Sequence, residues 1–232
     1  MHLILILIII IISYSILPTM ILKIYWYIKS YKMGEEKVVF LTFDDGPSSE
    51  YTPELLDLLK EFNIKASFFV VTDFAKENIN LIKRMKLEGH DIGVHSCSHE
   101  NSIYRGWKYT SRDLSESVKV MEEMNVRVLG YRPPWGHLNI FTLYMIKKLK
   151  LKLILWGAMA QDWKANTTVE EISRKIINKI DKGNLILCLH DGRGEKKAPE
   201  RTIEALRKTI PILIKKGYKF KSLGEYYESI YK

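Results

Sequence analysis

The chain has 232 residues, a length at which an α/β barrel commonly forms one domain around one sizeable core. Its formal net charge of +9 favours an anionic neighbour, such as a cell-wall polymer or a membrane surface. The sequence has no arginine-rich recognition helix, RNP-like strand or zinc-finger spacing, so we expect no nucleic-acid partner. Two cysteines, Cys97 and Cys188, are too few for a disulfide framework. We expect two small buried residues, with a regulatory disulfide or an additional metal ligand as the alternatives.

The chain begins with an uncharged apolar segment. Residues 3–22 read LILILIIIIISYSILPTMIL, and about 20 apolar residues are enough to cross a bilayer. Tyr25, Trp26 and Tyr27 follow and suit the aromatic belt of a membrane interface. We expect an uncleaved transmembrane anchor. A cleaved signal peptide is the alternative, but it would need basic residues first and a small-x-small cleavage site.

The positive charges on either side of this segment bear on its orientation in the membrane. Lys23, Lys29 and Lys32 all follow it, whereas only the amino group and His2 precede it. The positive-inside rule, taken alone, would therefore leave the main domain in the cytoplasm.

Three parts are expected: a membrane anchor or signal segment at residues 1–28, a linker at 29–36 and one domain at 37–232. Within the domain, apolar runs alternate with segments of helical periodicity, which indicates βαβ units and a parallel sheet. Continuous apolar runs such as FLTF and LILCL fit strands that are buried on both faces. About seven units favour an α/β fold of the distorted or incomplete (β/α)7 barrel type, preceded by one transmembrane helix. In chain order, the predicted strands span residues 37–43, 65–71, 91–95, 126–132, 151–156, 184–190 and 218–221, and the predicted helices span 52–62, 75–87, 110–124, 139–149, 168–180 and 199–216.

Polar residues cluster where the predicted strands end. The carboxyl ends of the strands are where α/β barrels build their active sites. These residues are Asp44, Asp45, His95, His99, Arg132, Asp162 (a few residues past its strand) and His190.

Asp44 and Asp45 need a positive partner, because two buried like charges are costly. His95 and His99 are four residues apart, so their rings would face one metal ion if the chain turns helically after its strand. Two histidines and one aspartate leave a coordination position open for water, as in catalytic zinc sites. One carboxylate would then be a ligand, and the other would be a base beside the bound water.

Two later segments complete the set. Arg132 precedes two prolines and a glycine, whose rigid loop can aim an N–H at an oxyanion, and the guanidinium can hold a carboxylate ionised. Asp162 and His190 suit a general acid, because a carboxylate behind a histidine raises the pKa of the imidazole and fixes its orientation. Each motif alone also fits a simpler structural role, as a turn or a core histidine.

Together the motifs resemble those of the polysaccharide deacetylases of carbohydrate esterase family 4, also called the NodB homology domain. The ordered series is TFDDGP at 42–47, HSxxH at 95–99, RPPWG at 132–136, DW at 162–163 and LxxH at 187–190. The resemblance spans residues 37 to about 218. It implies a distorted (β/α) barrel that removes acetyl groups from sugar polymers with a divalent metal ion.

The resemblance also implies a role for each matching residue. The metal ion would be Zn²⁺ by default, with Co²⁺ or Ni²⁺ as alternatives for the same ligands. The expected metal ligands are Asp45, His95 and His99. Asp44 is the expected base, tethered by Arg132, and His190 is the expected acid, whose charge and orientation Asp162 would determine. Pro134 and the backbone N–H of Trp135 would contact the substrate and the oxyanion, and Trp163 and Leu187 would line a pocket for the acetyl methyl group.

This sequence departs from the family pattern at two positions. Met159 stands where the fourth motif often has its first aspartate, which affects the hydrogen bonds that this aspartate would make. Trp135 stands where tyrosine is common, and a role that rests on the backbone N–H should survive this change.

The expected function is a metal-dependent hydrolase that releases acetate from a cell-surface polysaccharide containing N-acetylglucosamine. Peptidoglycan, chitin-like oligomers and exopolysaccharide all remain open as substrates. Because the family usually works outside the cytoplasm, we expect the anchored domain there, or secretion if the segment is cleaved. No protein partner is expected. The alternatives are a non-catalytic carbohydrate-binding protein and a metal-dependent hydrolase of another C–N or ester bond.

Overall fold

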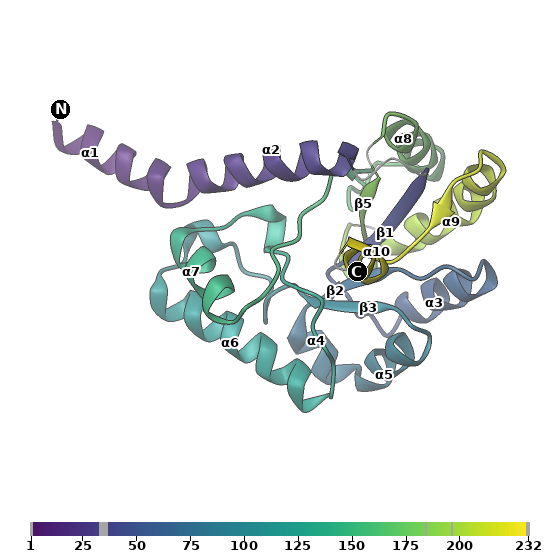
Figure 1. The fold of residues 1–232 in the computed structure, drawn as a ribbon, viewed down its shortest axis with the longest axis horizontal. Helices are drawn as coiled ribbons and strands as arrows, with labels where there is room; N and C mark the ends of the chain where they lie inside the picture. Colours follow the sequence, from purple (N-terminus) through teal and green to yellow (C-terminus); the bar gives the residue numbers. More distant parts are fainter. Residues whose placement is uncertain (1, 33–36, 184, 196, 231–232) are drawn as a thin grey trace.

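The computed structural model describes residues 2–32, 37–183, 185–195 and 197–230. Its centre is a parallel sheet surrounded by helices, and the N-terminal helix extends away from this body (Figure 1). The strands follow the order β3-β2-β1-β5-β4, and β6 pairs with the start of β1. The strands are β1 (Val38–Asp44), β2 (Ser67–Val70), β3 (Asp91–Val94), β4 (Ala158–Met159), β5 (Ile186–His190) and β6 (Lys219–Phe220).

Two predicted strands, 126–132 and 151–156, are not formed as strands. Each contributes one isolated parallel bridge, Val94 with Tyr131 and Tyr131 with Leu153. Gly130 approaches the neighbouring segment so closely that an added Cβ would lie 2.5 Å from the Lys152 carbonyl oxygen. These bridges extend the sheet beyond β3, which is consistent with the expected distorted barrel.

The helices broadly follow the predicted ranges, with one break. The predicted helix 75–87 is two helices, because Asn78 adopts a φ of −123° between them. Asn139 and Thr168 are the N-caps of α7 and α8, and each accepts a hydrogen bond from the backbone three residues on. The helices of the domain are α3 (Thr52–Glu61), α4 (Thr72–Glu77), α5 (Ile79–Leu87), α6 (Trp107–Glu123), α7 (Ile140–Lys148), α8 (Val169–Asp181), α9 (Ala198–Lys215) and α10 (Leu223–Ile230).

Strand β1 is the centre of the core. All seven of its residues are buried, as the continuous apolar run predicted. Phe43 of β1 stacks on Phe68 of β2, with ring centroids 5.2 Å apart. Burial on both faces fixes the strand in place, so the two aspartates that follow its last apolar residue start from a rigid support.

The N-terminal segment is helical throughout its described part. It comprises α1 (His2–Ile11), a π-helical turn η1 (Ile12–Ile16) and α2 (Leu17–Lys32). The expected linker 29–36 therefore begins inside α2, and its residues 33–36 lie outside the described residues. In the described ranges, no single helix combines the length and the apolar character that a bilayer crossing needs. The transmembrane helix expected at residues 3–22 thus stays a prediction.

Candidate active site

The polar residues singled out in the sequence meet at the carboxyl ends of the strands. Asp44 ends β1 and His190 ends β5, and the two residues are direct partners in the parallel pairing of these strands. His95 follows β3, which is separated from β5 by the two strands β2 and β1. Because parallel strands end at the same edge of the sheet, these three strands deliver their side chains to the same edge.

Asp44 is held by two donors. Arg132 Nη1 donates to Asp44 Oδ1 at 2.6 Å, and Cys188 Sγ donates to Asp44 Oδ2 at 3.3 Å. Burial, together with the Asp44 carboxylate, raises the pKa of the Cys188 thiol well above its ordinary value. Cys188 therefore stays protonated and acts as a donor, a role beyond the small buried residue expected from the sequence.

Arg132 is fully buried, yet its donors have partners. Besides Asp44, it donates to the Thr42 hydroxyl at 2.8 Å and to two backbone carbonyls on the segment 154–155. Its guanidinium also lies 3.9 Å from the centroid of the Phe69 ring. A buried ion pair persists only when its remaining hydrogen-bonding groups are satisfied, and this one meets that condition.

Asp45 faces the two histidines. Its Oδ1 lies 3.2 Å from His95 Nε2 and 2.9 Å from His99 Nε2. Burial alone would raise the pKa of Asp45, but the two imidazoles hold it well below its usual range. The sequence predicts a helical turn between the two histidines, and this prediction is wrong. Ser96 and His99 adopt positive φ values of 71° and 59°, which do not occur in a right-handed helix.

The donor set of this group fits a metal ion. His95 Nδ1 lies 2.7 Å from the Arg132 carbonyl oxygen, which can only accept, so Nδ1 carries the proton and Nε2 presents a lone pair. Asp45 Oδ1 is buried and faces the Nε2 atoms of both rings at 3.2 and 2.9 Å. Two imidazole nitrogens and a carboxylate oxygen that converge in this way form a donor set that suits Zn²⁺. Asp45, His95 and His99 form one of the two metal-compatible groups in the described residues.

The second such group comprises Asp44, Cys188 and His190. It is a weaker candidate, because Asp44 already has the Arg132 guanidinium as its cation. Its thiol is also protonated, and only a thiolate binds a metal ion well.

The rim loop, residues 134–138, borders the metal-compatible group. The Trp135 ring is half exposed and its centroid lies 4.4 Å from that of His99. Trp135 has a φ of 55° and a ψ of 8°, a left-handed conformation that is uncommon for a bulky residue. Pro134 is buried beneath it. A strained backbone at this place gives the loop one defined orientation when the surrounding contacts hold it.

His190 is oriented by Asp162. Asp162 Oδ1 lies 3.0 Å from His190 Nδ1, and Oδ2 accepts the backbone N–H of His190 at 2.8 Å. Thr202 of α9 donates to the same Oδ2 at 3.0 Å. Burial alone would lower the pKa of His190, but Asp162, with Asp45 and Asp44 beyond it, raises the pKa to about 9. Trp163 packs edge-on against His190, with centroids 5.2 Å apart.

The prediction for Leu187 is wrong. Side chains alternate along a strand, so Leu187 and His190, three residues apart in β5, point to opposite faces. Leu187 is fully buried in the hydrophobic core. Cys188 is the residue that shares a face with His190, as its contact with Asp44 shows.

Asp191 was missed in the sequence analysis. Its Oδ2 accepts a hydrogen bond from Thr52 at 2.6 Å, and its backbone N–H donates to the Asp44 carbonyl. Burial, and then the charges of Asp45 and Asp44, raise its pKa to about 7. It braces the turn after β1: a Cβ on Gly46 would meet the Asp191 carboxylate at 2.3 Å. Because Asp191 directly follows His190 in the sequence, its position could have indicated that it lies near the site.

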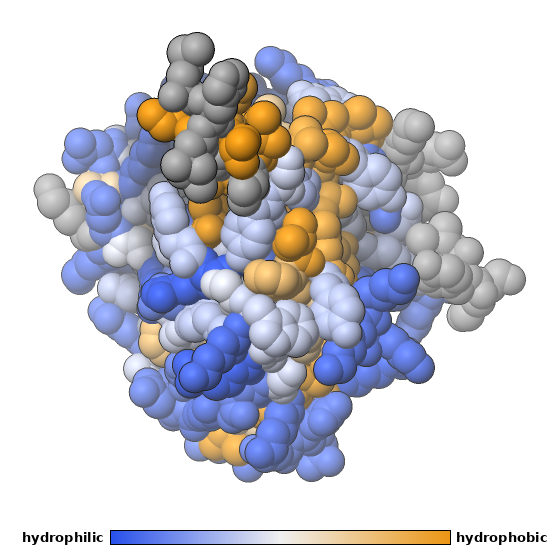
Figure 2. All heavy atoms as spheres, turned by 90° about the vertical axis from the view of Figure 1, so that its left-hand side faces the viewer, coloured by the Kyte–Doolittle hydropathy of each residue, from blue (hydrophilic) through white to orange (hydrophobic). Residues whose placement is uncertain are grey.

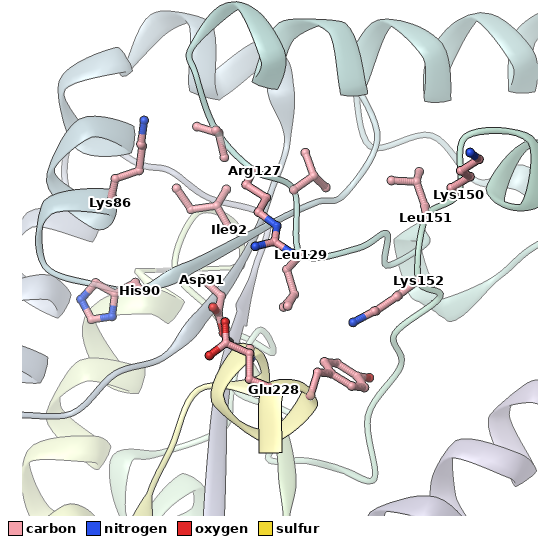
Figure 3. A pocket seen from close by; sticks show the side chains of 14 residues that line it. Lys86, His90, Asp91, Ile92, Arg127, Leu129, Lys150, Leu151, Lys152 and Glu228 are labelled. Atoms are coloured by element: carbon pink, nitrogen blue, oxygen red, sulfur yellow. Dashed lines mark hydrogen bonds between the residues drawn. The ribbon is translucent and has the colours of Figure 1, made fainter. Parts of the chain in front are cut away.

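A hollow elsewhere in the molecule is separate from this site. A cavity of about 680 Å³ lies at the opposite end of the sheet, where β3 begins, and α10 closes one side of it (Figure 3). Basic side chains from three segments surround Asp91 and Glu228 in this view. None of the motif residues lines it. The candidate active site therefore lies away from this cavity, at the carboxyl ends of the strands.

Comparison with known proteins gives the family. A family model described as polysaccharide deacetylase matches residues 31–154. The chain is also 33% identical over 194 residues to a peptidoglycan-N-acetylglucosamine deacetylase of Bacillus cereus, with 83% of this chain and 89% of the relative covered. The chain belongs to the polysaccharide deacetylase family. The resemblance drawn from the five motifs is confirmed.

Two further relatives mark the range of this deacetylase family. A chitooligosaccharide deacetylase of Azorhizobium caulinodans is 30% identical over 195 residues, with 80% of this chain and 92% of the relative covered. The structure of a family 4 acetyl xylan esterase from Clostridium thermocellum, in complex with a cobalt ion, superimposes with a TM-score of 0.72 at 29% identity, covering 82% of this chain and 90% of the other.

Proposed function

We propose that this deacetylase removes N-acetyl groups from a cell-surface polysaccharide containing N-acetylglucosamine and releases acetate. One observation carries the proposal: a carboxylate held by a buried arginine, Asp44 with Arg132, lies beside a cation-demanding group, Asp45 with His95 and His99. A base and a metal site side by side are what amide hydrolysis by water requires.

Asp45, His95 and His99 would hold the metal ion, and Zn²⁺ is the first choice for two imidazoles and one carboxylate. The relative with a bound cobalt ion makes Co²⁺ a reasonable substitute, and Ni²⁺ suits the same ligands. When bound, the ion supplies a Lewis acid that polarises the acetyl carbonyl and lowers the pKa of water.

Asp44 is assigned the role of general base. Arg132 donates to one of its oxygens and Cys188 to the other, which keeps the carboxylate ionised and fixed in direction. An ionised carboxylate next to the attacking water accepts its proton as the new bond to the acetyl carbon forms. Arg132 and Cys188 act on the substrate only through Asp44.

His190 is assigned the role of general acid. Asp162 raises its pKa, so His190 holds a proton at neutral pH and can give it to the departing nitrogen. The backbone N–H of Trp135 is the proposed donor to the oxyanion, from the rim loop over His99. Trp163, packed against His190, would form a wall for the acetyl methyl group.

The substrate class is inferred from what the relatives share. The Bacillus cereus relative is named for peptidoglycan N-acetylglucosamine and the Azorhizobium relative for chitooligosaccharide. N-acetylglucosamine is the sugar common to both substrates. The net charge of +9 favours an anionic polymer such as a cell wall over a neutral short oligomer.

We place the domain at the outer face of a membrane, held by the N-terminal segment. Residues of α1 and α2 that point away from the domain are apolar and exposed, among them Ile4, Ile9, Leu17, Met20 and Ile24. Figure 2 views the face from which α1 projects and shows hydrophobic residues beside this helix and in a band on the body. Protease added to intact spheroplasts should digest the domain, and full protection would refute this location.

The decisive assay measures acetate release by the zinc-loaded full chain in detergent micelles. Peptidoglycan, N-acetylglucosamine oligomers and acetylated xylan are compared side by side, and Asp44→Asn serves as the blank. Release from the first two substrates that disappears in the blank supports the proposal. Release from xylan alone favours an esterase, as the Clostridium relative suggests. Binding of polymer without any release favours a non-catalytic carbohydrate-binding protein.

A further inference from the structure

The N-terminal helix contacts the candidate active site through polar side chains. Ser15 and Thr19 lie inside an otherwise apolar segment, yet both are buried. Ser15 Oγ donates to the Leu138 carbonyl at 2.5 Å, and Thr19 Oγ1 donates to the same oxygen at 3.0 Å. Thr19 also accepts the Leu138 N–H at 3.1 Å. In the described structure, both backbone polar groups of Leu138, a residue of the rim loop, thus bond to the helix.

Lys23, one turn further along α2, reaches the residue proposed as oxyanion donor. Its Nζ donates to the Trp135 carbonyl at 3.0 Å. The next residue, Gly136, lies so close that an added Cβ would be 2.9 Å from Lys23 Cε and 2.8 Å from the Trp156 ring. Gly136 also has a φ of +64°, so only glycine allows this approach without strain. The glycine at position 136 therefore allows the loop to pack closely against the helix.

The backbone of Trp135 needs such support. Its left-handed φ of 55° costs free energy, and a conformation of this kind persists only where neighbouring contacts determine it. The direction of the Trp135 N–H depends on that φ. Its carbonyl accepts a hydrogen bond from Lys23, and the backbone groups of Leu138, three residues on, bond to Ser15 and Thr19.

We propose that α2, with the turn η1 that precedes it, is a positioning element of the active site: through Ser15 of η1 and Thr19 and Lys23 of α2 it fixes the rim loop, and with it the direction of the Trp135 N–H. The statement about catalysis rests on the proposed function, whereas the statement about the loop does not. Residues 15–23 precede residues 31–154, the range that the family model matches, so this brace lies outside the matched range.

A second contact shows that the helix is fastened at both ends. Ser30 is buried near the end of α2, and its Oγ accepts the backbone N–H of Leu185 at 3.1 Å and that of Ile186 at 3.2 Å. Ile186 begins β5, the strand that ends in His190. Trp26, between the two contacts, is buried in the core cluster. The helix therefore has a fixed place on the domain, which a positioning element requires.

The test uses the full-length, zinc-loaded chain in detergent micelles. Thr19→Val removes the hydroxyl at nearly constant volume, and Thr19→Ser keeps it. Lys23→Met removes the ammonium group at similar length. Lys29→Met is the matched control, because Lys29 lies on the same helix but packs against the Trp26 ring.

Amide hydrogen exchange of residues 135–138 is the first readout and needs no activity. We expect Thr19→Val to raise the exchange rate of the Leu138 amide about tenfold or more, because its hydrogen-bond partner is lost. Thr19→Ser and Lys29→Met should exchange like the wild type. Unchanged exchange in both Thr19→Val and Lys23→Met overturns the inference.

Steady-state kinetics is the second readout. Thr19→Val and Lys23→Met should lower kcat by about tenfold, part of the loss of about 100- to 1000-fold that follows removal of an oxyanion donor. KM and zinc affinity should stay constant, because the contact matters mainly in the transition state. A rise in KM with constant kcat overturns the catalytic part. An inactive wild type defeats the proposed function instead, and the exchange data still decide whether α2 holds the loop.

Discussion

Asp44 and His190 occupy paired positions on the neighbouring strands β1 and β5. Asp44 accepts a hydrogen bond from Arg132, and His190 is hydrogen-bonded to Asp162. A carboxylate that accepts from an arginine and an imidazole whose pKa is raised thus lie side by side, with their ligand atoms within 4.8 Å of each other. A proton acceptor and a proton donor this close together can serve a single reaction.

Replacing the proposed base should abolish turnover without loss of the metal ion. Asp44→Asn keeps the size of the side chain, and we expect kcat to fall by about 100- to 10,000-fold. Zinc affinity should stay within about threefold of the wild-type value, because Asp45 is the proposed carboxylate ligand. Acetate release and zinc titration on the same preparation check both points. Loss of zinc binding in Asp44→Asn would mean that the two aspartates have exchanged roles.

Removing the arginine should destabilise the fold. Arg132→Met leaves the buried Asp44 carboxylate without its cation, and breaking a buried pair in this way costs about 3–5 kcal/mol of unfolding free energy. Urea denaturation measures the loss. The double variant Arg132→Met/Asp44→Asn should recover part of it, because no buried charge is then left alone. Equal stabilities of the single and the double variant would contradict this coupling.

The rate should fall on the alkaline side as His190 loses its proton. Its pKa is raised to about 9, so the acid form is present below that pH and disappears as the pH rises through it. A metal ion bound to Asp45 would lower the pKa of His190. The alkaline fall in the rate of the metal-loaded enzyme should therefore be centred at or below pH 9. Asp162→Asn removes the charge that raises the pKa and should move the limb to lower pH. A profile of kcat/KM against pH that is identical in both proteins would contradict this assignment.

The indole of Trp135 should matter less than its backbone. Trp135→Tyr is expected to retain acetate release within about tenfold, because the proposed donor is the main-chain N–H. KM for long oligomers can change, since the half-exposed ring forms part of the rim. Assays on oligomers of increasing length separate the two effects. Complete inactivity of a folded Trp135→Tyr would show that the ring itself takes part.

Chelation should silence the enzyme reversibly. EDTA is expected to abolish acetate release, and Zn²⁺ or Co²⁺ should restore it, since imidazole and carboxylate ligands accept both ions. His99→Ala should not be restored, because one of the three proposed ligands is missing. Activity that persists after exhaustive dialysis against the chelator would count against a metal-dependent reaction.

The sequence predicted the site better than the strands around it. Each catalytic motif lies where a strand or its bridging residue ends, so the chain order and the rule for parallel sheets were sufficient. The strand expected at 126–132 is reduced to a bridge at Tyr131, although Leu129, Gly130 and Arg132 also form backbone hydrogen bonds with β3. Apolar composition indicates burial, but it does not report how many residues in a row can pair.

Two misses have identifiable causes. Leu187 was assigned by its place in a motif, although the alternation of side chains in β5 already placed Cys188 on the face of His190. The role of α2 had no such signal, because apolar residues next to serine and threonine fit a membrane segment as well as a docked helix. Only the contacts of Ser15, Thr19 and Ser30 distinguish the two.

The two-point attachment of α2 has a consequence for how the protein meets its polymer. Ser15 and Ser30 are 15 residues apart, a separation of roughly 22 Å along a helix, and each is bonded to a different part of the domain. A single tether would let the domain swivel, whereas two fasteners hold it at one angle to whatever α1 is attached to. With the anchor and the substrate proposed above, such a domain would work at a set height above the membrane and would modify the glycan strands at that level, so the pattern of free amines along the polymer would reflect the architecture of the layer.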